Sequence, residues 1–526
     1  MLLGCSNLKP LPPRAAKIPH TTTIHGQTRV DDYFWLREKQ NPAVIAYLRA
    51  ENDYTERVLA PLKPLQEQLY REFLSRLQED DAEAPYRDGA YLYYSRTEKG
   101  KDYRIYCRRS SPDAPEQIIL DVNELARGHD YLSVPFRAVS DDGNLLAFGV
   151  SYSAFREHRL YVKDLRSGAM VRLGGDMDVS SIAWAADNRT LFFCVEDESK
   201  RPYRVYRQSL DGAEPVLVYE EADRAFNTVV GRTRSGRFIV IASGSANTAD
   251  AHFIPADSPT TAPRRLAARV DGQEYYVDDT GPDGQWVLRV NDTGRNFRLV
   301  TAPVGDSERL QWRQLVPHRD DVMLEDHLCF RRHIVLAERT GGLPRLTVLD
   351  RDSGQTHSLA MPEAVYNLFT DHNEVFDTTV VRFVYESPIT PSSTFEYDMQ
   401  TRTSRLIRRL PVPNYDPDRY EVLQQFATAD DGTRVPISIV RRKDLGQGPH
   451  PLWLTAYGAY GLPEIPDFSA TRFSLLDRGV IFAIAHVRGG GEMGKLWHEQ
   501  GRLMQKRNTF TDFIACAEHL IRQNLT

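Results

Sequence analysis

Short apolar segments recur along the middle of the chain, between residues 90 and 385, and polar stretches separate them. Each has a core of three to five mainly apolar residues, which is too short for a helix and typical of a buried strand. The cores are Tyr91–Tyr94, Leu145–Phe148, Leu191–Phe193, Phe238–Ile241, Trp286–Leu288, Ile334–Leu336 and Val380–Val384.

The spacing of these cores is nearly constant. The first gap is 54 residues, and the later starts lie 46, 47, 48, 48 and 46 residues apart. A second strand follows most cores, and turn pairs such as Asp142-Gly143 and Asp283-Gly284 separate the strands. Several short strands per unit, at a period in the forties, predict a β-propeller, and seven starts predict seven blades. An irregular β-sandwich is the alternative, but it has no reason to keep a constant period.

The two ends of the chain are patterned differently. Residues 42–77 place apolar side chains at helical spacing, and the proline-rich segment 411–417 ends the periodic region. The elements expected after it are a strand at 452–456, a helix at 470–478, a buried strand at 480–487 and a helix from Thr509. This order, β-α-β-α, predicts an α/β layer.

Composition narrows the class of protein. The chain has 526 residues, a net charge of −6 and 41% hydrophobic residues, which fits two or more globular domains and gives no electrostatic case for binding nucleic acid. No apolar run approaches the roughly 20 residues of a membrane helix. The five cysteines lack CxxC spacing, which argues against a disulfide framework or a zinc cluster. Three of them fall inside patterned segments and are predicted core thiols: Cys107, Cys194 and Cys516.

The beginning of the chain leaves its location open. Leu2-Leu3-Gly4-Cys5 resembles the end of a bacterial lipoprotein signal, but the charged and apolar regions that should precede it are missing. We expect a cytoplasmic protein. The alternative is a periplasmic lipoprotein attached to the membrane through Cys5, which requires a start further upstream.

A glycine-rich stretch at residues 486–501 raises the possibility of a nucleotide site. Gly489, Gly491 and Gly494 match both a near P-loop and the dinucleotide pattern G-x-G-x-x-G. However, Leu496 stands where a P-loop needs a hydroxyl for Mg²⁺. We therefore predict no nucleotide binding and interpret the glycines as sites of tight turning and close backbone approach.

The local pattern also argues against a helix that starts at Gly494, as a dinucleotide site would require. The first convincing helix begins later, where Thr509-x-x-Asp512 resembles a capping box. Motifs for catalysis are scarce in the residues themselves. No serine satisfies the nucleophile elbow G-x-S-x-G, and neither HExxH nor another metal-ligand pattern occurs. The residues alone therefore leave catalysis unassigned, and we expect no cofactor and no metal.

Five motifs carry a resemblance to a known family. They are His25–Arg37 (HGxxRxDDYFWLR), Asp431–Ile437 (DGTxVPI), Tyr457–Gly461 (YGAYG), His486–Glu492 (HVRGGGE) and Asn508–Phe513 (NTFxDF). Together they resemble the prolyl oligopeptidase family of serine peptidases, and the YGxYG and HVRGGG forms resemble its oligopeptidase B branch. The resemblance extends from about His20 to Thr526.

The resemblance implies a seven-bladed β-propeller plus an incomplete α/β-hydrolase domain. Residues 1–77 would pack on the hydrolase domain, residues 78–417 would form the propeller, and residues 418–526 would be the N-terminal part of the hydrolase domain. It also implies cleavage of short peptides after Arg or Lys. The family's Ser, Asp and His triad would all come after Thr526, so that this chain alone should be inactive.

The resemblance places one catalytic group in the chain. The first tyrosine of the YGxYG turn, Tyr457, would donate its hydroxyl to the oxyanion of the reaction. The alternative is a buried aromatic residue in a turn.

Two acids in the following loop are candidate substrate-binding residues. The branch typically has two acids here, two residues apart, which help to hold basic residues of the peptide. This chain has Asp467 at the second place, Ile465 at the first, and Glu464 beside it. The alternative for both acids is a solvated loop.

The remaining polar residues of the glycine-rich stretch are expected to be structural. Arg488 and Glu492 should pair with each other or with neighbours, and His498 should not act as a base. The leading hypothesis is a serine oligopeptidase that acts on short basic peptides. The alternative is a propeller-based binding or scaffold protein with a degenerate hydrolase remnant, and an in-frame G-x-S-x-G downstream would decide between them.

Overall fold

The computed structural model describes residues 10–305 and 311–526, and Cys5 lies outside these residues. Contacts divide the chain into two units, Met1–Leu77 and Gln78–Thr526. The described part of the first unit contains a hairpin of β1 (His20–Ile24) and β2 (Gln27–Asp31), followed by α1 (Pro42–Leu59) and α2 (Lys63–Ser75). The helical pattern of residues 42–77 is therefore confirmed. The Asn41 side chain caps α1 by accepting a hydrogen bond from the Ala43 amide at 2.9 Å.

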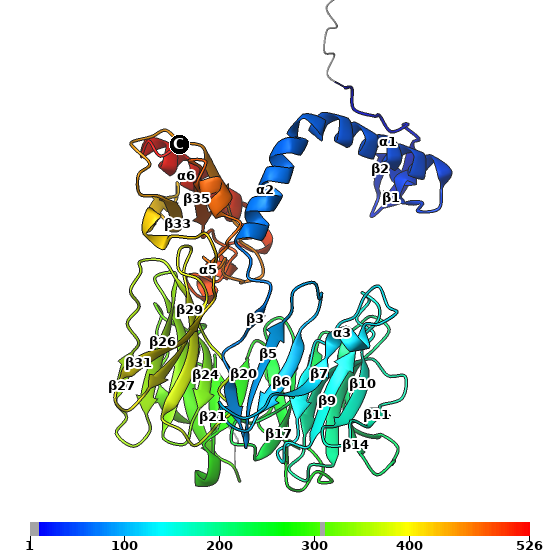
Figure 1. The fold of residues 1–526 in the computed structure, drawn as a ribbon, viewed down its shortest axis with the longest axis vertical. Helices are drawn as coiled ribbons and strands as arrows, with labels where there is room; N and C mark the ends of the chain where they lie inside the picture. Colours follow the sequence, from blue (N-terminus) through cyan, green and yellow to red (C-terminus); the bar gives the residue numbers. More distant parts are fainter. Residues whose placement is uncertain (1–9, 306–310) are drawn as a thin grey trace, which may run out of the picture. The chain divides into compact units, whose positions relative to one another are not determined.

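The second unit begins with seven antiparallel sheets that follow one another along the chain, as the colours of Figure 1 show. Blade 1 contains β3 (Asp81–Ala82), β4 (Tyr86–Asp88), β5 (Tyr91–Thr97), β6 (Ile105–Arg109) and β7 (Gln117–Asp121), and the short α3 (Val122–Leu125) follows it. Blade 2 contains β8 (Arg137–Val139), β9 (Leu145–Val150), β10 (Arg159–Asp164) and β11 (Met170–Leu173). Blade 3 contains β12 (Val179–Trp184), β13 (Thr190–Glu196), β14 (Pro202–Ser209) and β15 (Val216–Glu220).

The other four blades repeat this order. Blade 4 contains β16 (Asn227–Arg232), β17 (Phe238–Gly244), β18 (Ala249–Pro255) and β19 (Arg264–Arg265). Blade 5 contains β20 (Tyr275–Asp279), β21 (Gln285–Val290), β22 (Arg298–Pro303) and β23 (Arg313–Val316). Blade 6 contains β24 (Met323–Cys329), β25 (His333–Thr340), β26 (Leu343–Asp350) and β27 (Thr356–Ser358). Blade 7 contains β28 (Asn367–Thr370), β29 (Val380–Glu386), β30 (Ser393–Asp398) and β31 (Thr403–Arg409).

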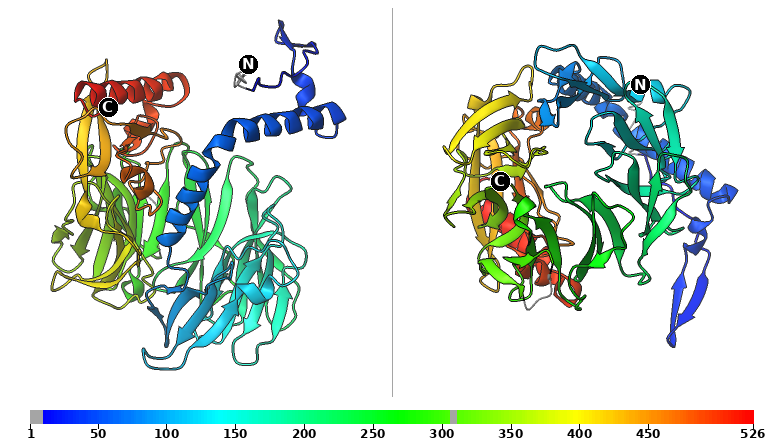
Figure 2. Two further views of the ribbon diagram at one scale, coloured as in Figure 1. Left: turned by 45° about the horizontal axis from the view of Figure 1, so that its top comes forward. Right: turned by 90° about the horizontal axis from the view of Figure 1, so that it is seen from below.

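The predicted seven-bladed propeller is thus confirmed. Each of the seven predicted cores lies in the second main strand of its blade, from β5 to β29. Figure 2 shows the sheets standing in a ring when the molecule is seen from below. Within the described residues, the predicted core thiols Cys107, Cys194 and Cys516 are free and buried. No helix in this part of the chain is long and apolar enough to cross a membrane.

Apolar side chains fill the spaces between neighbouring blades. Between blades 4 and 5, for example, Trp286 is fully buried with its ring centroid 4.6 Å from that of Phe238 and 4.9 Å from that of Phe253. Five other clusters join blades 1 and 2, 2 and 3, 3 and 4, 5 and 6, and 6 and 7. Burial of this apolar surface is the main force that holds successive blades together.

The junction between blades 7 and 1 is different. No strand is shared between the first and last sheets. Instead the buried Arg382 of β29 donates hydrogen bonds to the carbonyl oxygens of Ala84 and Pro85, both at 2.6 Å. Arg408 pairs with Asp81. The ring is therefore closed by polar contacts from side chains to the backbone and to a carboxylate, together with the stacked rings of Tyr86 and His372.

The chain then forms a mixed sheet with the strand order β32-β33-β35-β34. Its strands are β32 (Tyr420–Thr428), β33 (Arg434–Arg442), β34 (Leu452–Thr455) and β35 (Ile481–Ala485), and its helices are α4 (Phe473–Leu476), α5 (Lys495–Glu499) and α6 (Arg507–Arg522). Only β34 and β35 are parallel. The helix expected over residues 470–478 is thus confined to four residues, whereas the predicted buried strand and last helix are present.

Candidate active site

Two turns meet at one edge of the mixed sheet. Because β34 and β35 are parallel, the segments that follow them, from Ala456 and from His486, leave the sheet at the same edge. The Gly461 amide donates to the Gly489 carbonyl oxygen at 3.0 Å. A Cβ atom on Gly489 would lie 2.1 Å from the Gly458 carbonyl oxygen. The glycines therefore permit a close crossing of two backbones, as the sequence analysis expected.

Arg488 fixes the second of these turns. Its buried guanidinium donates to Asp512 at 2.6 and 2.9 Å and to Asp431 at 2.6 Å. Hydrogen bonding from Arg488 is the largest cause that lowers the pKa of Asp431, to about 2. The Thr509 hydroxyl donates to the Arg488 carbonyl oxygen at 2.6 Å. Arg488 therefore pairs with neighbours, and the pair with Glu492 that the sequence allowed is not formed.

The expected capping box at Thr509 and Asp512 is wrong. Helix α6 begins at Arg507, and its N-cap residue Lys506 makes no side-chain cap. The side chains of Thr509 and Asp512 are directed instead to the Arg488 turn. Tertiary hydrogen bonds thus take the polar groups that a local pattern assigns to the end of the helix.

Helix α5 is a second departure from the sequence expectation. It follows Gly494, where local pattern argued against a helix. Its first amide, that of Lys495, donates to the Asn296 side-chain oxygen at 3.1 Å, and the Lys495 ammonium group pairs with Glu274. Arg295 also pairs with Glu499. These contacts with blade 5 stabilise a five-residue helix that its own sequence does not favour.

A buried polar chain supports the loop that carries the candidate acids. Ser438 Oγ and His486 Nε2 are 2.7 Å apart, and His486 Nδ1 lies 3.5 Å from a Glu492 carboxylate oxygen. The same oxygen accepts the Glu464 amide hydrogen bond at 2.9 Å. These three side chains have the order of a serine–histidine–acid relay, but all are at most 5% exposed, so that a substrate cannot reach them. Their role is to hold the loop at Glu464.

Tyr457 lies directly beyond β34, at the edge where the two turns meet. Its side chain is 48% exposed, which differs from the buried aromatic residue that the sequence left as an alternative. Within the described residues its hydroxyl has no hydrogen-bond partner. A phenol in this position is accessible to a bound molecule.

The two candidate acids are not equivalent. The Asp467 carboxylate accepts a hydrogen bond from the Arg472 guanidinium at 2.8 Å, and the same guanidinium also donates to the Asp467 carbonyl oxygen at 2.8 Å. Glu464 has no such cation, and burial, followed by the charge of Glu492, raises the pKa of its carboxyl group. Glu464 is therefore the acid whose charge is less compensated.

A third acid, Glu386, approaches this loop from blade 7. It ends β29 and accepts a hydrogen bond from the Asn367 side chain at 3.0 Å. Burial raises its pKa, and the charge of Asp467 raises it further. Glu386 was not predicted from the sequence, because no local pattern links it to a loop about eighty residues later. Burial lowers the pKa of His498, and its ring packs against Gly461.

Comparison with known proteins shows the family to which the chain belongs. A model of the prolyl oligopeptidase N-terminal β-propeller domain matches residues 13–409, and a model of the prolyl oligopeptidase family matches residues 466–526. Dipeptidyl aminopeptidase BI of Pseudoxanthomonas mexicana is 38% identical over 97% of this chain and 74% of its own length. Protease 2 of Moraxella lacunata is 34% identical over 98% of this chain and 75% of its own length.

A solved structure agrees with these sequence relatives. Oligopeptidase B from Leishmania major has a TM-score of 0.90 and 32% identity, and the match covers 98% of this chain and 77% of that protein. The propeller model alone spans more than half of the sequence, and the relatives match it almost from end to end. With its seven-bladed propeller and its α/β layer, this chain belongs to the prolyl oligopeptidase family of serine peptidases.

Proposed function

We propose that the protein is a serine oligopeptidase that cleaves short peptides after Arg or Lys, and that its propeller limits the size of the substrate. The observation that carries this proposal is the accessible Tyr457 hydroxyl at an edge of the sheet, beside a loop whose Glu464 carboxylate is incompletely compensated. Membership of a peptidase family supports the reaction, and the acids support the preference for cationic side chains.

We assign Tyr457 the role of the hydrogen-bond donor to the oxyanion. In the complete enzyme, Tyr457→Phe should lower kcat about ten- to a thousandfold with little change in KM, because the hydroxyl acts mainly on charge that develops in the transition state. Tyr460→Phe, at the exposed second tyrosine of the same turn, is the matched control. An effect of Tyr457→Phe confined to KM would remove Tyr457 from this role.

We assign Glu464 and Asp467 the recognition of basic residues in the substrate. Steady-state kinetics on Arg-Arg and Gly-Arg substrates should show that Glu464→Gln reduces the preference for Arg-Arg more than Asp467→Asn does, because Arg472 already neutralises Asp467. Equal ratios in the wild type and both variants would leave these acids as a solvated loop. No serine in the 526 residues sits in a G-x-S-x-G motif, so we expect residues 1–526 by themselves to be inactive on both substrates.

Removal of dipeptides from a free amino terminus is a second candidate function. It is favoured by the 38% identity with a protein named dipeptidyl aminopeptidase BI, and the Glu464 carboxylate has the charge to hold a terminal ammonium group. Substrates with free and acetylated amino termini separate the two candidates. An oligopeptidase should cleave both, whereas a dipeptidyl aminopeptidase should cleave only the free form.

We also propose a cytoplasmic location, with a lipoprotein attached through Cys5 as the alternative. Fractionation of cells that express the gene with its upstream region tests this. Membrane association that Cys5→Ser abolishes would establish the lipoprotein, and recovery of both forms in the cytosol would support the cytoplasmic protein.

A further inference from the structure

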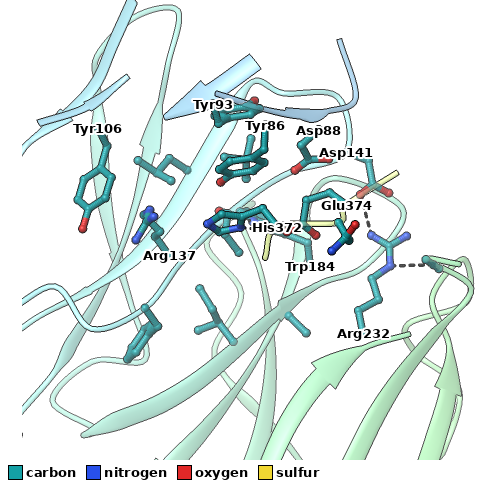
Figure 3. A pocket seen from close by; sticks show the side chains of 18 of the residues that line it. Tyr86, Asp88, Tyr93, Tyr106, Arg137, Asp141, Trp184, Arg232, His372 and Glu374 are labelled. Atoms are coloured by element: carbon teal, nitrogen blue, oxygen red, sulfur yellow. Dashed lines mark hydrogen bonds and ion pairs between the residues drawn. The ribbon is translucent and has the colours of Figure 1, made fainter. Parts of the chain in front are cut away.

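A cavity of about 730 Å³ lies in the propeller, away from the candidate active site. Residues of blades 1, 2, 3, 4 and 7 line it. Six of the lining side chains matter here (Figure 3): Tyr86 and Asp88 begin and end β4, Arg137 begins β8, Arg232 ends β16, and His372 and Glu374 follow β28.

The acidic side of the cavity lies toward the face of the propeller opposite the α/β part, and none of the lining residues belongs to the α/β part. The α/β part contacts the opposite ends of the innermost strands: Lys495 pairs with Glu274, which directly precedes β20. Asn367, the first residue of β28, likewise lies beside Glu386, near Asp467. Because Arg232 ends β16 and His372 and Glu374 follow β28, these residues lie at the strand ends remote from the α/β part, and Tyr457 and Glu464 are not among the lining residues.

One side of the cavity carries negative charge that neighbouring groups neutralise only in part. Three acids lie here, Asp88, Asp141 and Glu374, and Arg232 forms an ion pair with Asp141 at 2.7 Å. Glu374 has only His372 Nδ1 as a partner, at 3.4 Å, and Asp88 has no ion-pair partner among the described residues. Burial, followed by the charges of Glu374 and Asp141, raises the pKa of Asp88 to about 6. Such a pair of carboxylates favours a bound cation.

The other side carries a cation without a carboxylate partner in the described part of the chain. The Arg137 guanidinium stacks on the Tyr106 ring at 3.9 Å and forms no ion pair there. Arg234, a further lining residue, is already used, since it donates to the Cys329 carbonyl oxygen at 2.9 Å and stacks on Phe330. Arg137 is therefore the cation that remains available to a ligand.

An aromatic pair separates these charges. The rings of Tyr86 and His372 are stacked with centroids 3.8 Å apart. Figure 3 shows Arg137 on one side of this pair and Asp88 and Glu374 on the other. The charges of Arg137, Glu374 and Asp88 all act on the pKa of the Tyr86 hydroxyl, so the three groups lie within electrostatic range of it.

We propose that this cavity binds a short peptide whose two ends are both free. The terminal ammonium group lies between Asp88 and Glu374, the terminal carboxylate pairs with Arg137, and the peptide backbone crosses the stacked Tyr86 and His372 rings. A cavity of about 730 Å³ has the size of a small-ligand site and accommodates a peptide of a few residues. The site needs no basic side chain and no catalytic group, and it is separate from the proposed peptidase function.

Isothermal titration calorimetry of residues 1–526 with trialanine tests the proposal. Trialanine has both free ends and no Arg or Lys at which the proposed peptidase would cut. It should bind at neutral pH, whereas N-acetyl-trialanine and trialanine amide should bind at least about tenfold more weakly, because each has lost one terminal charge. Absence of trialanine binding at millimolar concentration, or equal binding of the blocked peptides, overturns the proposal.

Single substitutions test whether trialanine binds in this cavity. Asp88→Asn, Glu374→Gln and Arg137→Gln should each weaken trialanine binding about tenfold or more. Asp352→Asn, at an exposed acid of blade 6 that pairs with Arg332, is the matched control and should bind as the wild type does. Thermal melting should show that each variant is folded, because the substituted side chains line an open cavity and belong to none of the apolar clusters.

The same titrations separate this proposal from the peptidase function. Glu464→Gln and Tyr457→Phe should bind trialanine with unchanged affinity if the cavity is the site. Loss of binding in these variants, with retention in Asp88→Asn, would move the peptide to the candidate active site and overturn the proposal. A failure of the peptidase assays would leave the binding result intact.

Discussion

In the described part of the chain, the junctions between successive blades are filled by apolar clusters. The junction between blades 7 and 1 is joined mainly by polar contacts of Arg382 and Arg408, with one stacked pair of rings, Tyr86 and His372. Successive blades follow one another along the chain, so each blade can pack on the preceding one as it forms. The last junction joins segments 298 residues apart, and Arg382 reaches the Ala84 carbonyl oxygen only when the ring is complete.

This difference in chemistry implies a difference in response. An apolar cluster loses stability with the volume removed from it, and it is insensitive to charge. A buried guanidinium that satisfies two carbonyl oxygens depends on single hydrogen bonds, and each lost bond leaves a polar group without a partner.

Trp286→Ala should destabilise the propeller most. The side chain is fully buried between blades 4 and 5, and such a truncation typically costs about 3–5 kcal/mol because it leaves a cavity. Urea unfolding followed by circular dichroism measures the loss. Phe155→Ala is the control, since Phe155 is 75% exposed and should change the midpoint little. A loss below about 1 kcal/mol for Trp286→Ala would contradict the apolar account of these junctions.

Arg382→Met should weaken mainly the junction between blades 7 and 1. The variant keeps apolar bulk but leaves the Ala84 and Pro85 carbonyl oxygens and Asp371 without their donor, at a cost of about 2–3 kcal/mol. Hydrogen exchange should accelerate in β4 and β29 and remain slow in β21.

The control for this variant is Arg405→Met, whose side chain is 76% exposed and pairs with Glu396 on the same blade. Acceleration spread evenly over all blades would show that this junction is no weaker a point than the others.

Asp278→Asn should stabilise the protein at neutral pH by about 1–2 kcal/mol. Burial raises the pKa of Asp278 to about 6 from an ordinary 3.8, so that the folded state binds this proton more tightly than the unfolded state. Stability from this group therefore falls as pH rises from about 4 to about 6 and stays constant above that.

Unfolding midpoints measured between pH 4 and 8 should be flatter for Asp278→Asn than for the wild type, whereas Asp352→Asn, at an exposed acid, should keep the wild-type profile. Parallel profiles for all three proteins would mean that Asp278 is ionised without cost inside the junction between blades 4 and 5.

Asp377→Ala should have the smallest effect. Asp377 forms an ion pair with Arg331 between blades 6 and 7, but the two side chains are 66% and 56% exposed. Exposed pairs of this kind contribute about 0–1 kcal/mol, and salt screens them. Urea unfolding in low and high salt measures the change. A loss comparable with that of Arg382→Met would show that exposed polar contacts support the ring as much as buried ones.

The sequence predicted the repeating architecture well because the signal is local. Each blade needs its own alternation of apolar strands and turns, so the period of about 47 residues is present in the chain itself. Helical spacing over residues 42–77 and the apolar strand at 480–487 are equally local, and both elements are present. The family resemblance added the two-part fold, which the comparisons confirm.

The sequence failed where a distant segment competes with a local pattern. Thr509 and Asp512 fit a capping box, but both side chains form hydrogen bonds with the buried Arg488 instead. Lys495–Glu499 has a weak helical pattern, yet Asn296 and Glu274 of blade 5 stabilise it as α5. In each case a hydrogen bond between distant segments outweighs a preference of a fraction of a kcal/mol.

What the amino-acid sequence determined by itself is therefore the set of elements and their order: seven repeated sheets and an α/β layer. The tertiary structure alone decided which charges meet. It brought Arg382 to the first blade, Glu386 to the loop of Glu464, and Asp88, Glu374 and Arg137 to one cavity. Periodicity is encoded between near neighbours in the sequence, whereas these charges come together only in the folded chain, so no local pattern predicts their contacts.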